Sequence, residues 1–518
     1  MNARAVTFAI GFTVALNSHH AHAQGAVPIT AEHMRQRIEA FSNDSMLGRG
    51  LAGAGHVRAT NYIAAELKRL HVPPFGENYT YFQTLPVTAV RLDLENARLG
   101  SHGIFLQPGT DFVPIVTAGG VPFPMEVHVP NLAQAAVAPV HVGAVFGGVL
   151  GAANAISPDS AIGRVVVFLP PARPDGQPDY QVSTTAPALA AYERSGAVLI
   201  EGLELMPRRA REALLGLGLR TTRPDSFALR LPPVVMVTHS AGETIAVGLS
   251  GELTTTVSFA SKTTDPRAPV RNVLAMIDGS DLTLRSEFVV LTARSDHLGI
   301  ADSARRIGAD SIANGADAGS GAMALLEIAG YIASLREKPK RSIVFVWTAG
   351  GESGSLGTDY FLSHPDLLAR GQIVAAIDIG AISRGAPADL PGGGPDYVQI
   401  AGARRLSTDL GQLLGEVSAR PELGLRVDST VDAAGHPLRL ACHGSIWAFQ
   451  RFGIPAAFVT TGAHPDADEV TDEAAHVDAD KAARVARFLA SAAVELANRP
   501  SRPRVQSPPA SVRASCTQ

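Results

Sequence analysis

The chain has 518 residues, which is more than one hydrophobic core usually accommodates and predicts two or three domains. Hydrophobic residues make up 46% of the chain and charged residues 18%, values typical of a soluble globular protein. The formal net charge of -4 gives no broad electrostatic attraction to nucleic acid, so we expect no nucleic-acid partner.

Residues 1–23 are typical of a secretory signal peptide. Arg4 supplies the positive start, an apolar run extends from Ala5 to Leu16, and Ala21-His22-Ala23 forms an A-x-A cleavage site. We therefore expect export to the periplasm or the extracellular space, with a mature chain that begins at Gln24. The apolar run is too short to cross a bilayer and no later run is long enough, so no membrane span is predicted.

Two regions with different residue patterns follow the signal peptide. Residues 24–112 begin with two helical patterns on either side of a Gly-rich loop, DSMLGRGLAGAG. Residues 113–262 contain the short β-rich runs VVVFLPP, AVLIEG and LPPVVMVTH. These short runs predict a small β-rich domain inserted into a larger one.

From residue 263 to 498 apolar runs alternate with helical patterns. The runs are FVVLTA, SIVFVWTAG, IVAAIDIG and AAFVTTG. Strands of this kind, buried on both faces and separated by helices, predict an α/β fold with a mostly parallel central sheet flanked by helices. Residues 499–518 are rich in Pro and Ser and are expected to be disordered. The two cysteines, Cys442 and Cys516, allow one disulfide, but the tail position of Cys516 argues against a disulfide framework.

Carboxylates recur near the ends of the predicted strands. They are Asp296, Asp317, Glu352, Asp378 and Asp468. Because parallel strands end at a shared edge, these side chains are expected to converge. Converging carboxylates repel one another unless protons or a cation intervene, and a metal ion is the usual solution.

Three of these acids also have a simpler explanation. Asp317 is a candidate helix N-cap, and Glu352 is suited to the first turn of a helix. Asp468 is one of several acids in a loop that solvent would cover. Their recurrence at successive strand ends favours the convergent site.

The chain resembles a known family through these same blocks. ARSDHLG, NGADAGSG, TAGGESGSLGTDYF, AAIDIG and GAHPDADEVTDEAAHVD occur in the order found in the di-zinc exopeptidases related to aminopeptidase Y and glutamate carboxypeptidase, metallopeptidase family twenty-eight. The insert resembles a protease-associated (PA) domain through AIGRVVVFLPP, AAYERSGAVLI and LPPVVMVTH. The resemblance covers nearly the whole mature chain. It implies a zinc-exopeptidase-like fold that binds the N-terminus of a peptide or protein.

The resemblance also implies a site with two zinc ions, a bridging carboxylate and a Glu general base. Asp317 matches the bridging carboxylate, and Glu352 matches a zinc ligand beside that base. Asp378 matches the Asp ligand of the other zinc, and Asp296 matches the Asp that orients the first His ligand.

Three ligand or base positions depart from the family pattern. Arg294 stands in place of the first His ligand, Gly351 in place of the Glu base, and Asp468 in place of the last His ligand. His464 and His476 are alternatives to Asp468 in that loop.

These departures change the expected chemistry. Arg stays protonated and cannot ligate a metal, but its guanidinium pairs well with carboxylates. Arg294 is therefore predicted to replace the charge of one zinc; alternatively, it faces solvent from a loop. Asp317, Glu352 and Asp468 would remain as an oxygen site, which suits Ca²⁺, Mg²⁺ or Mn²⁺ better than zinc and is alternatively empty.

The sequence thus predicts a silent or weakly active peptidase homologue that binds peptide or protein. Gly351 offers no general base, and His297 and His464 are expected to line the site. The alternative is an active metallo-exopeptidase with a rearranged or single-metal site. A third hypothesis, a serine hydrolase, rests on Ser353 in GGESGSLG, which is similar to a nucleophile elbow except for Ser355 at its final position.

Overall fold

The fold was analysed in a computed structural model. It describes residues 26–101, 104–115, 140–172, 176, 178, 188–206, 218–221, 232, 234–246, 255–300, 306–351, 355–436, 438–442 and 444–507. Over these ranges, every helix is too short or too polar to cross a membrane.

An eight-stranded sheet forms the centre of the main domain. Its order is β1-β12-β16-β13-β17-β20-β18-β19. The four central strands, β16, β13, β17 and β20, run parallel, which confirms the predicted mostly parallel sheet. The bounds are β1 (Phe82–Leu85), β12 (Val270–Ile277), β13 (Phe288–Arg294), β16 (Ser342–Thr348), β17 (Ile373–Ile379), β18 (Tyr397–Ala401), β19 (Arg426–Asp428) and β20 (Ala456–Thr460).

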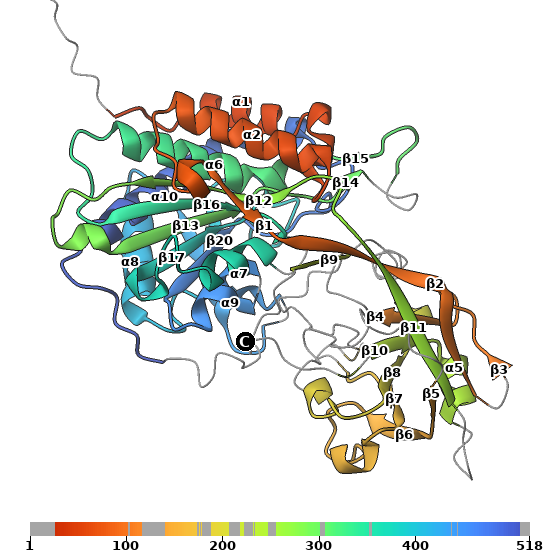
Figure 1. The fold of residues 1–518 in the computed structure, drawn as a ribbon. Coiled ribbons are helices and arrows are strands. Elements are labelled where there is room, and N and C mark those ends of the chain that lie inside the picture. Colours follow the sequence, from red (N-terminus) through yellow and green to blue (C-terminus); the bar gives the residue numbers. More distant parts are fainter. Residues whose placement is uncertain are drawn as a thin grey trace, which may run out of the picture.

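Helices cover both faces of this sheet, as the Val- and Ile-rich strands require. On one face lie α1 (Ala31–Phe41), α2 (Ala54–Arg69), α6 (Ala316–Ser334), α8 (Thr408–Ser418) and α10 (Ala479–Asn498). On the other lie α7 (Leu356–Ser363) and α9 (Gly444–Gln450). Figure 1 shows α1 and α2 above α6, and α7 and α9 below the sheet.

A second unit has a hydrophobic core of its own. One of its sheets has the order β4-β10-β8-β7-β6, and the other has the order β3-β2-β11-β5 with β9 paired to β2. Their bounds are β2 (Val87–Ser101), β3 (Ile104–Phe105), β4 (Phe112–Ile115), β5 (Val140–Val142), β6 (Ala144–Val149), β7 (Val165–Leu169), β8 (Ala197–Glu201), β9 (Gly218–Thr221), β10 (Val234–Val237) and β11 (Thr255–Thr264), with the helix α5 (His239–Ala246).

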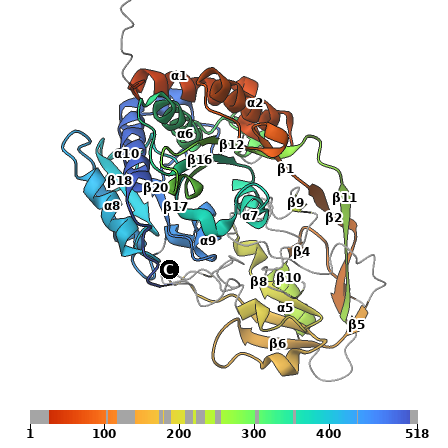
Figure 2. The ribbon, with the colours of Figure 1, turned by 60° about the vertical axis from the view of Figure 1, so that its left-hand side comes forward.

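The long antiparallel strands β2 and β11 connect this unit to the main domain (Figures 1 and 2). They continue from β1 and into β12, so the unit is an insertion between two neighbouring strands of the main sheet. The expected boundary at residue 113 falls inside the unit, because Ala97 and Leu99 already pack in its core.

The C-terminal segment differs from the disorder expected from residue 499 onward. Residues 499–507 lie against the main domain, because three arginines each find an acid on it. Arg499 pairs with Glu416, Arg502 with Glu287 and Arg504 with Asp409. Residues 508–518, with Cys516, lie outside the described residues. Cys442 is disulfide-bonded, and the sequence had allowed one disulfide.

α6 approaches the sheet very closely at Gly321. A Cβ atom there would lie 2.2 Å from the carbonyl oxygen of Gly380 and 2.6 Å from that of Ile379. Both oxygens belong to the end of β17 and the residue after it, so this contact sets the distance between the start of α6 and the strand ends.

Gly321→Ala should therefore destabilise the protein by about 1–3 kcal/mol, since overpacking against main chain forces a backbone shift. Gly415→Ala, in α8, is the matched control, because an added Cβ there meets no atom within 4 Å. Alanine favours a helix over glycine, so the control should be as stable as wild type or more stable by up to about 1 kcal/mol. Urea denaturation measures both, and equal stability of the two variants would contradict the close approach.

Candidate functional site

The predicted site residues follow the carboxyl ends of the four parallel strands. Arg294 ends β13, and Asp378 lies near the end of β17. Gly351 comes three residues after β16, and His464 four residues after β20. Because the strands are parallel neighbours, all of these residues lie at one edge of the sheet, as predicted.

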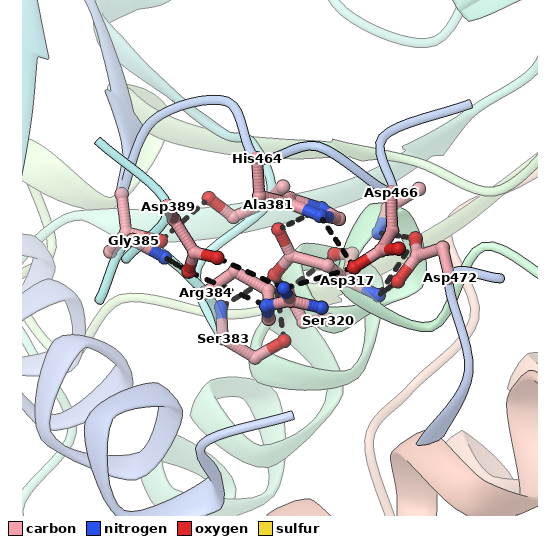
Figure 3. A network of polar contacts seen from close by, with 12 residues as sticks. Asp317, Ser320, Ala381, Ser383, Arg384, Gly385, Asp389, His464, Asp466 and Asp472 are labelled. Atoms are coloured by element: carbon pink, nitrogen blue, oxygen red, sulfur yellow. Dashed lines mark hydrogen bonds and ion pairs between the residues drawn. The ribbon is translucent and has the colours of Figure 1, made fainter. Parts of the chain in front are cut away.

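Asp317 is the centre of a polar network at this edge (Figure 3). It lies in the first turn of α6 and is fully buried. Its Oδ1 accepts hydrogen bonds from the main-chain N–H and the hydroxyl of Ser383, both at 2.7 Å. Its Oδ2 lies 3.2 Å from Nε2 of His464. Asp317 is a candidate N-cap by sequence, but its carboxylate instead binds the segment that follows β17.

His464 brings an imidazole to this carboxylate. Its side chain is 3% exposed. Burial lowers the pKa of His464, but the hydrogen bond and the charge of Asp317 outweigh burial, so its pKa is raised. The imidazole is therefore held against Asp317, and its protonated form is favoured there. Asp468, predicted to take the last ligand position, is exposed, with φ of 64°.

Asp472 is a site residue that sequence reasoning missed. It lies in the same acidic loop as Asp468, yet it is 1% exposed. Its carboxylate accepts from the main-chain N–H of Asp317 at 3.1 and 3.2 Å, and so caps α6 from 155 residues away. Burial, followed by the charge of Asp317, raises the pKa of Asp472. No local pattern indicates a cap from so distant a loop.

Two loops meet around this centre through Arg384. Its Nη2 lies 3.0 Å from Oδ1 of Asp389 and 3.1 Å from Oδ2 of Asp466 (Figure 3). Asp389 follows β17 and Asp466 follows β20. Arg384 thus holds the segments that carry Ser383 and His464 in a fixed relation to Asp317.

Asp378 is buried beside β13. Thr292 Oγ1 donates to its Oδ1 at 2.6 Å. Burial raises the pKa of Asp378 to about 6, although Thr292, the charge of Arg294 and hydrogen bonds from Ser445 oppose this rise. Arg294 thus lies close enough to act electrostatically on this carboxylate.

Arg294 and Gly351 are in close contact. A Cβ atom at position 351 would lie 2.9 Å from Cβ of Arg294 and 3.0 Å from its Cδ. The main-chain N–H of Gly351 donates to Oδ1 of Asp296 at 3.1 Å. In this arrangement the stem of Arg294 fills the space in which a side chain at 351 would begin.

His297 is buried against the turn before α6. A Cβ atom at Gly315 would lie 2.2 Å from Cδ2 of its imidazole. Its main-chain N–H donates to the carbonyl of Arg49 at 3.3 Å. The ring also acts electrostatically on Asp472, whose pKa it lowers. His297 therefore lines the site at the side of α6.

The family resemblance implies a two-zinc site, and the structure describes only some of the expected ligand positions. Within the residues that the structure describes, three or more His, Cys, Asp or Glu side chains are nowhere grouped to hold a metal ion. Arg294 stands at one expected ligand position. The predicted ligand Glu352, and Ser353 of the serine-hydrolase hypothesis, lie outside the described residues.

Asp378→Asn should stabilise the metal-free protein at neutral pH. The folded-state pKa of about 6 exceeds the ordinary 3.8. The stability of wild type therefore decreases as the pH rises from about 4 through 6, because the buried carboxyl group must lose its proton in the folded state. Relative to wild type, the variant should gain roughly 1–3 kcal/mol at pH 7.5 and almost nothing at pH 4. Urea denaturation in the presence of a chelator measures this difference.

Asp409→Asn is the control of opposite sign. The hydrogen bond from Arg504 lowers the pKa of Asp409, so its contribution is present at neutral pH and is lost as pH falls through the folded-state pKa. This variant should be no more stable than wild type at pH 7.5. A gain for Asp378→Asn that does not change with pH would contradict the assignment.

Comparisons with known proteins bear on the fold that carries this site. Residues 272–493 match the family model described as peptidase family M28. No curated protein matches the chain. The chain is similar in structure to an aminopeptidase from Aneurinibacillus sp. strain AM-1, with 14% identity, 92% of this chain and 96% of that chain covered, and a TM-score of 0.53. It is also similar to a zinc aminopeptidase from Bacillus subtilis, with 15% identity, coverage of 90% and 95%, and a TM-score of 0.51. The chain therefore has an aminopeptidase-like fold, and its residues 272–493 are similar to peptidase family M28.

Proposed function

We propose that this protein is an exported, silent or weakly active relative of the metallo-aminopeptidases that binds the N-terminus of a peptide or protein. The observation that carries the proposal is the contact between Arg294 and Gly351 beside Asp378. Arg294 stands where the family resemblance implies a metal-ligating imidazole. It also packs against the position of the implied general base.

The charges at the strand ends support binding of an ammonium group. Asp317 and Asp378 are buried carboxylates, and the guanidinium of Arg294 cannot ligate a metal. A peptide α-ammonium would supply further charge and hydrogen-bond donors to these acids, in addition to those of Arg294 and His464. An α-ammonium is also the group that a peptide presents to an aminopeptidase, so this ligand class needs no new architecture.

Weak or absent hydrolysis follows from Gly351. A general base that takes a proton from the attacking water typically contributes roughly 10²–10⁴ in rate. Glycine has no side chain for this role. A larger residue at 351 would also need Arg294 to move, because the space beside its Cβ is occupied.

Two further features belong to the proposal. The insertion between β1 and β12, which has its own core, supports a PA-like domain. Export is supported by the signal-like residues 1–23 and by the disulfide of Cys442, since disulfides persist mainly in oxidising compartments.

An active metallo-exopeptidase with a single metal is the second candidate. The contact of 3.2 Å between His464 and Asp317 favours it, because imidazole nitrogen and carboxylate oxygen together are a donor pair that zinc accepts. In such an enzyme these two side chains would hold the ion, and Asp472 would keep Asp317 in place.

Three measurements on the dialysed mature protein separate these candidates: bound metal by elemental analysis, hydrolysis of aminoacyl substrates, and peptide binding by fluorescence anisotropy. We expect less than stoichiometric zinc, little hydrolysis, and binding of a free peptide that N-terminal acetylation of the peptide abolishes. Stoichiometric zinc together with turnover would overturn the proposal in favour of the second candidate.

Arg294→His combined with Gly351→Glu should raise zinc binding to about one ion per chain, because His464 already supplies an imidazole beside Asp317. Asp468→His is the matched control, since residue 468 is exposed. Added to the double variant, it should increase the zinc content no further. If zinc uptake required Asp468→His, then residue 468 rather than His464 would be the last ligand.

A further inference from the structure

We propose that Arg49 is the positioning residue of this site. Its guanidinium binds the main-chain carbonyls of the turn before α6 and thereby fixes Asp317. The inference rests on the proposed site at the strand ends, but not on whether that site hydrolyses peptides.

Arg49 is a fully buried cation in the short 3-10 helix η1 (Asp44–Arg49). Its Nη1 donates to the carbonyls of Phe41 at 2.9 Å and Asn314 at 2.7 Å, and its Nη2 donates to the carbonyl of Gly315 at 2.8 Å. The guanidinium also lies 4.7 Å from the centre of the Phe41 ring. A buried charge is costly unless it is hydrogen-bonded, and a planar fork can reach several carbonyls at fixed directions.

Two of these carbonyls belong to the turn that starts α6. Asn314 and Gly315 directly precede the helix, and Gly315 has φ of 57°. Asp317 follows two residues later, and its main-chain N–H is held by Asp472. The carbonyl side of the turn is therefore held by Arg49, and the N–H side by Asp472.

The side chain of Asn314 joins further loops to the same turn. Its Nδ2 donates to Asp44 at 2.8 Å and to Glu473 at 2.9 Å. Asp44 begins the helix that ends at Arg49, and Glu473 follows the capping residue Asp472. The turn is thus the meeting point of an N-terminal loop and a C-terminal loop.

The main chain around Arg49 reaches a second segment of the site. Its carbonyl accepts from the N–H of His297, and Gly50 forms a parallel bridge with the same residue. A Cβ atom at Gly48 would lie 2.5 Å from the carbonyl oxygen of Gly299 and 2.6 Å from that of Ala313. Residues 48–50 therefore form a wedge between residues 297–299 and residues 313–315. Both segments lead to site residues, so Arg49 couples them.

Hydrogen exchange in Arg49→Lys tests this role. Lysine keeps the charge but not the planar fork, so protection of amides in residues 295–300 and 313–319 should fall at least about tenfold, the loss expected for hydrogen bonds to a charged group. Residues 165–169 and 234–237 of the second unit should be unchanged. Arg341→Lys is the matched control: Arg341 is 1% exposed and bonds Glu287 at 2.7 Å, away from the site. It should leave both site segments protected.

Three outcomes would overturn the proposal. They are no loss of protection in Arg49→Lys, an even loss across the main domain, or the same local loss in Arg341→Lys. If Arg49→Lys does not fold, hydrogen exchange of the wild type is measured in increasing, sub-denaturing concentrations of urea. If residues 48–50 couple the two segments, residues 295–300 and 313–319 should open together. Separate opening would contradict coupling through residues 48–50.

Measuring peptide binding by wild type separates a failure of this proposal from a failure of the proposed function. If wild type binds no peptide, the proposed function fails, whereas the exchange pattern still decides the role of Arg49. If wild type binds peptide, Arg49→Lys should weaken binding while Arg341→Lys should not. An unchanged affinity in Arg49→Lys would show that the turn does not position the binding groups.

Discussion

A fully buried carboxylate, Asp317, is the constraint around which the main domain is arranged. A charge removed from water must be hydrogen-bonded or paired. The segments after two different strands meet this need, with Ser383 after β17 and His464 after β20. Asp472 caps the helix that carries the acid. The hydrogen bonds of Asp317 and its contact with His464 therefore hold the loops at the strand ends in place.

The chain supplies its own cations to these acids. Arg294 acts on Asp378, and His464 lies against Asp317. Lys481 is buried nearby on α10, where burial lowers its pKa to about 8 against the opposing charges of Asp478 and Asp317. Fixed protein cations cannot leave as a metal can. Such cations contribute to the shape of the site independently of a bound ion.

The sequence predicted the sheet because its central strands are buried on both faces, and it predicted the shared edge because parallel strands end together. It did not predict which loop residue reaches the centre. His464 and Asp468 are four residues apart in one loop, and only tertiary packing decides between them. Asp472 was missed because its partner lies 155 residues away. Ala97 was assigned to the main domain because a strand's own sequence does not say with which sheet it pairs.

The way in which the second unit is attached has a consequence for the history of such chains. β1 and β12 are antiparallel neighbours in which Leu85 pairs with Val270. The two ends of the inserted segment therefore leave the sheet side by side, as the ends of an ordinary hairpin would. A short turn could join them and leave the register of the sheet intact. Gain, loss or exchange of the whole module is thus a local event for the host domain, and lineages of this architecture can acquire new accessory modules without refolding the sheet that carries the site.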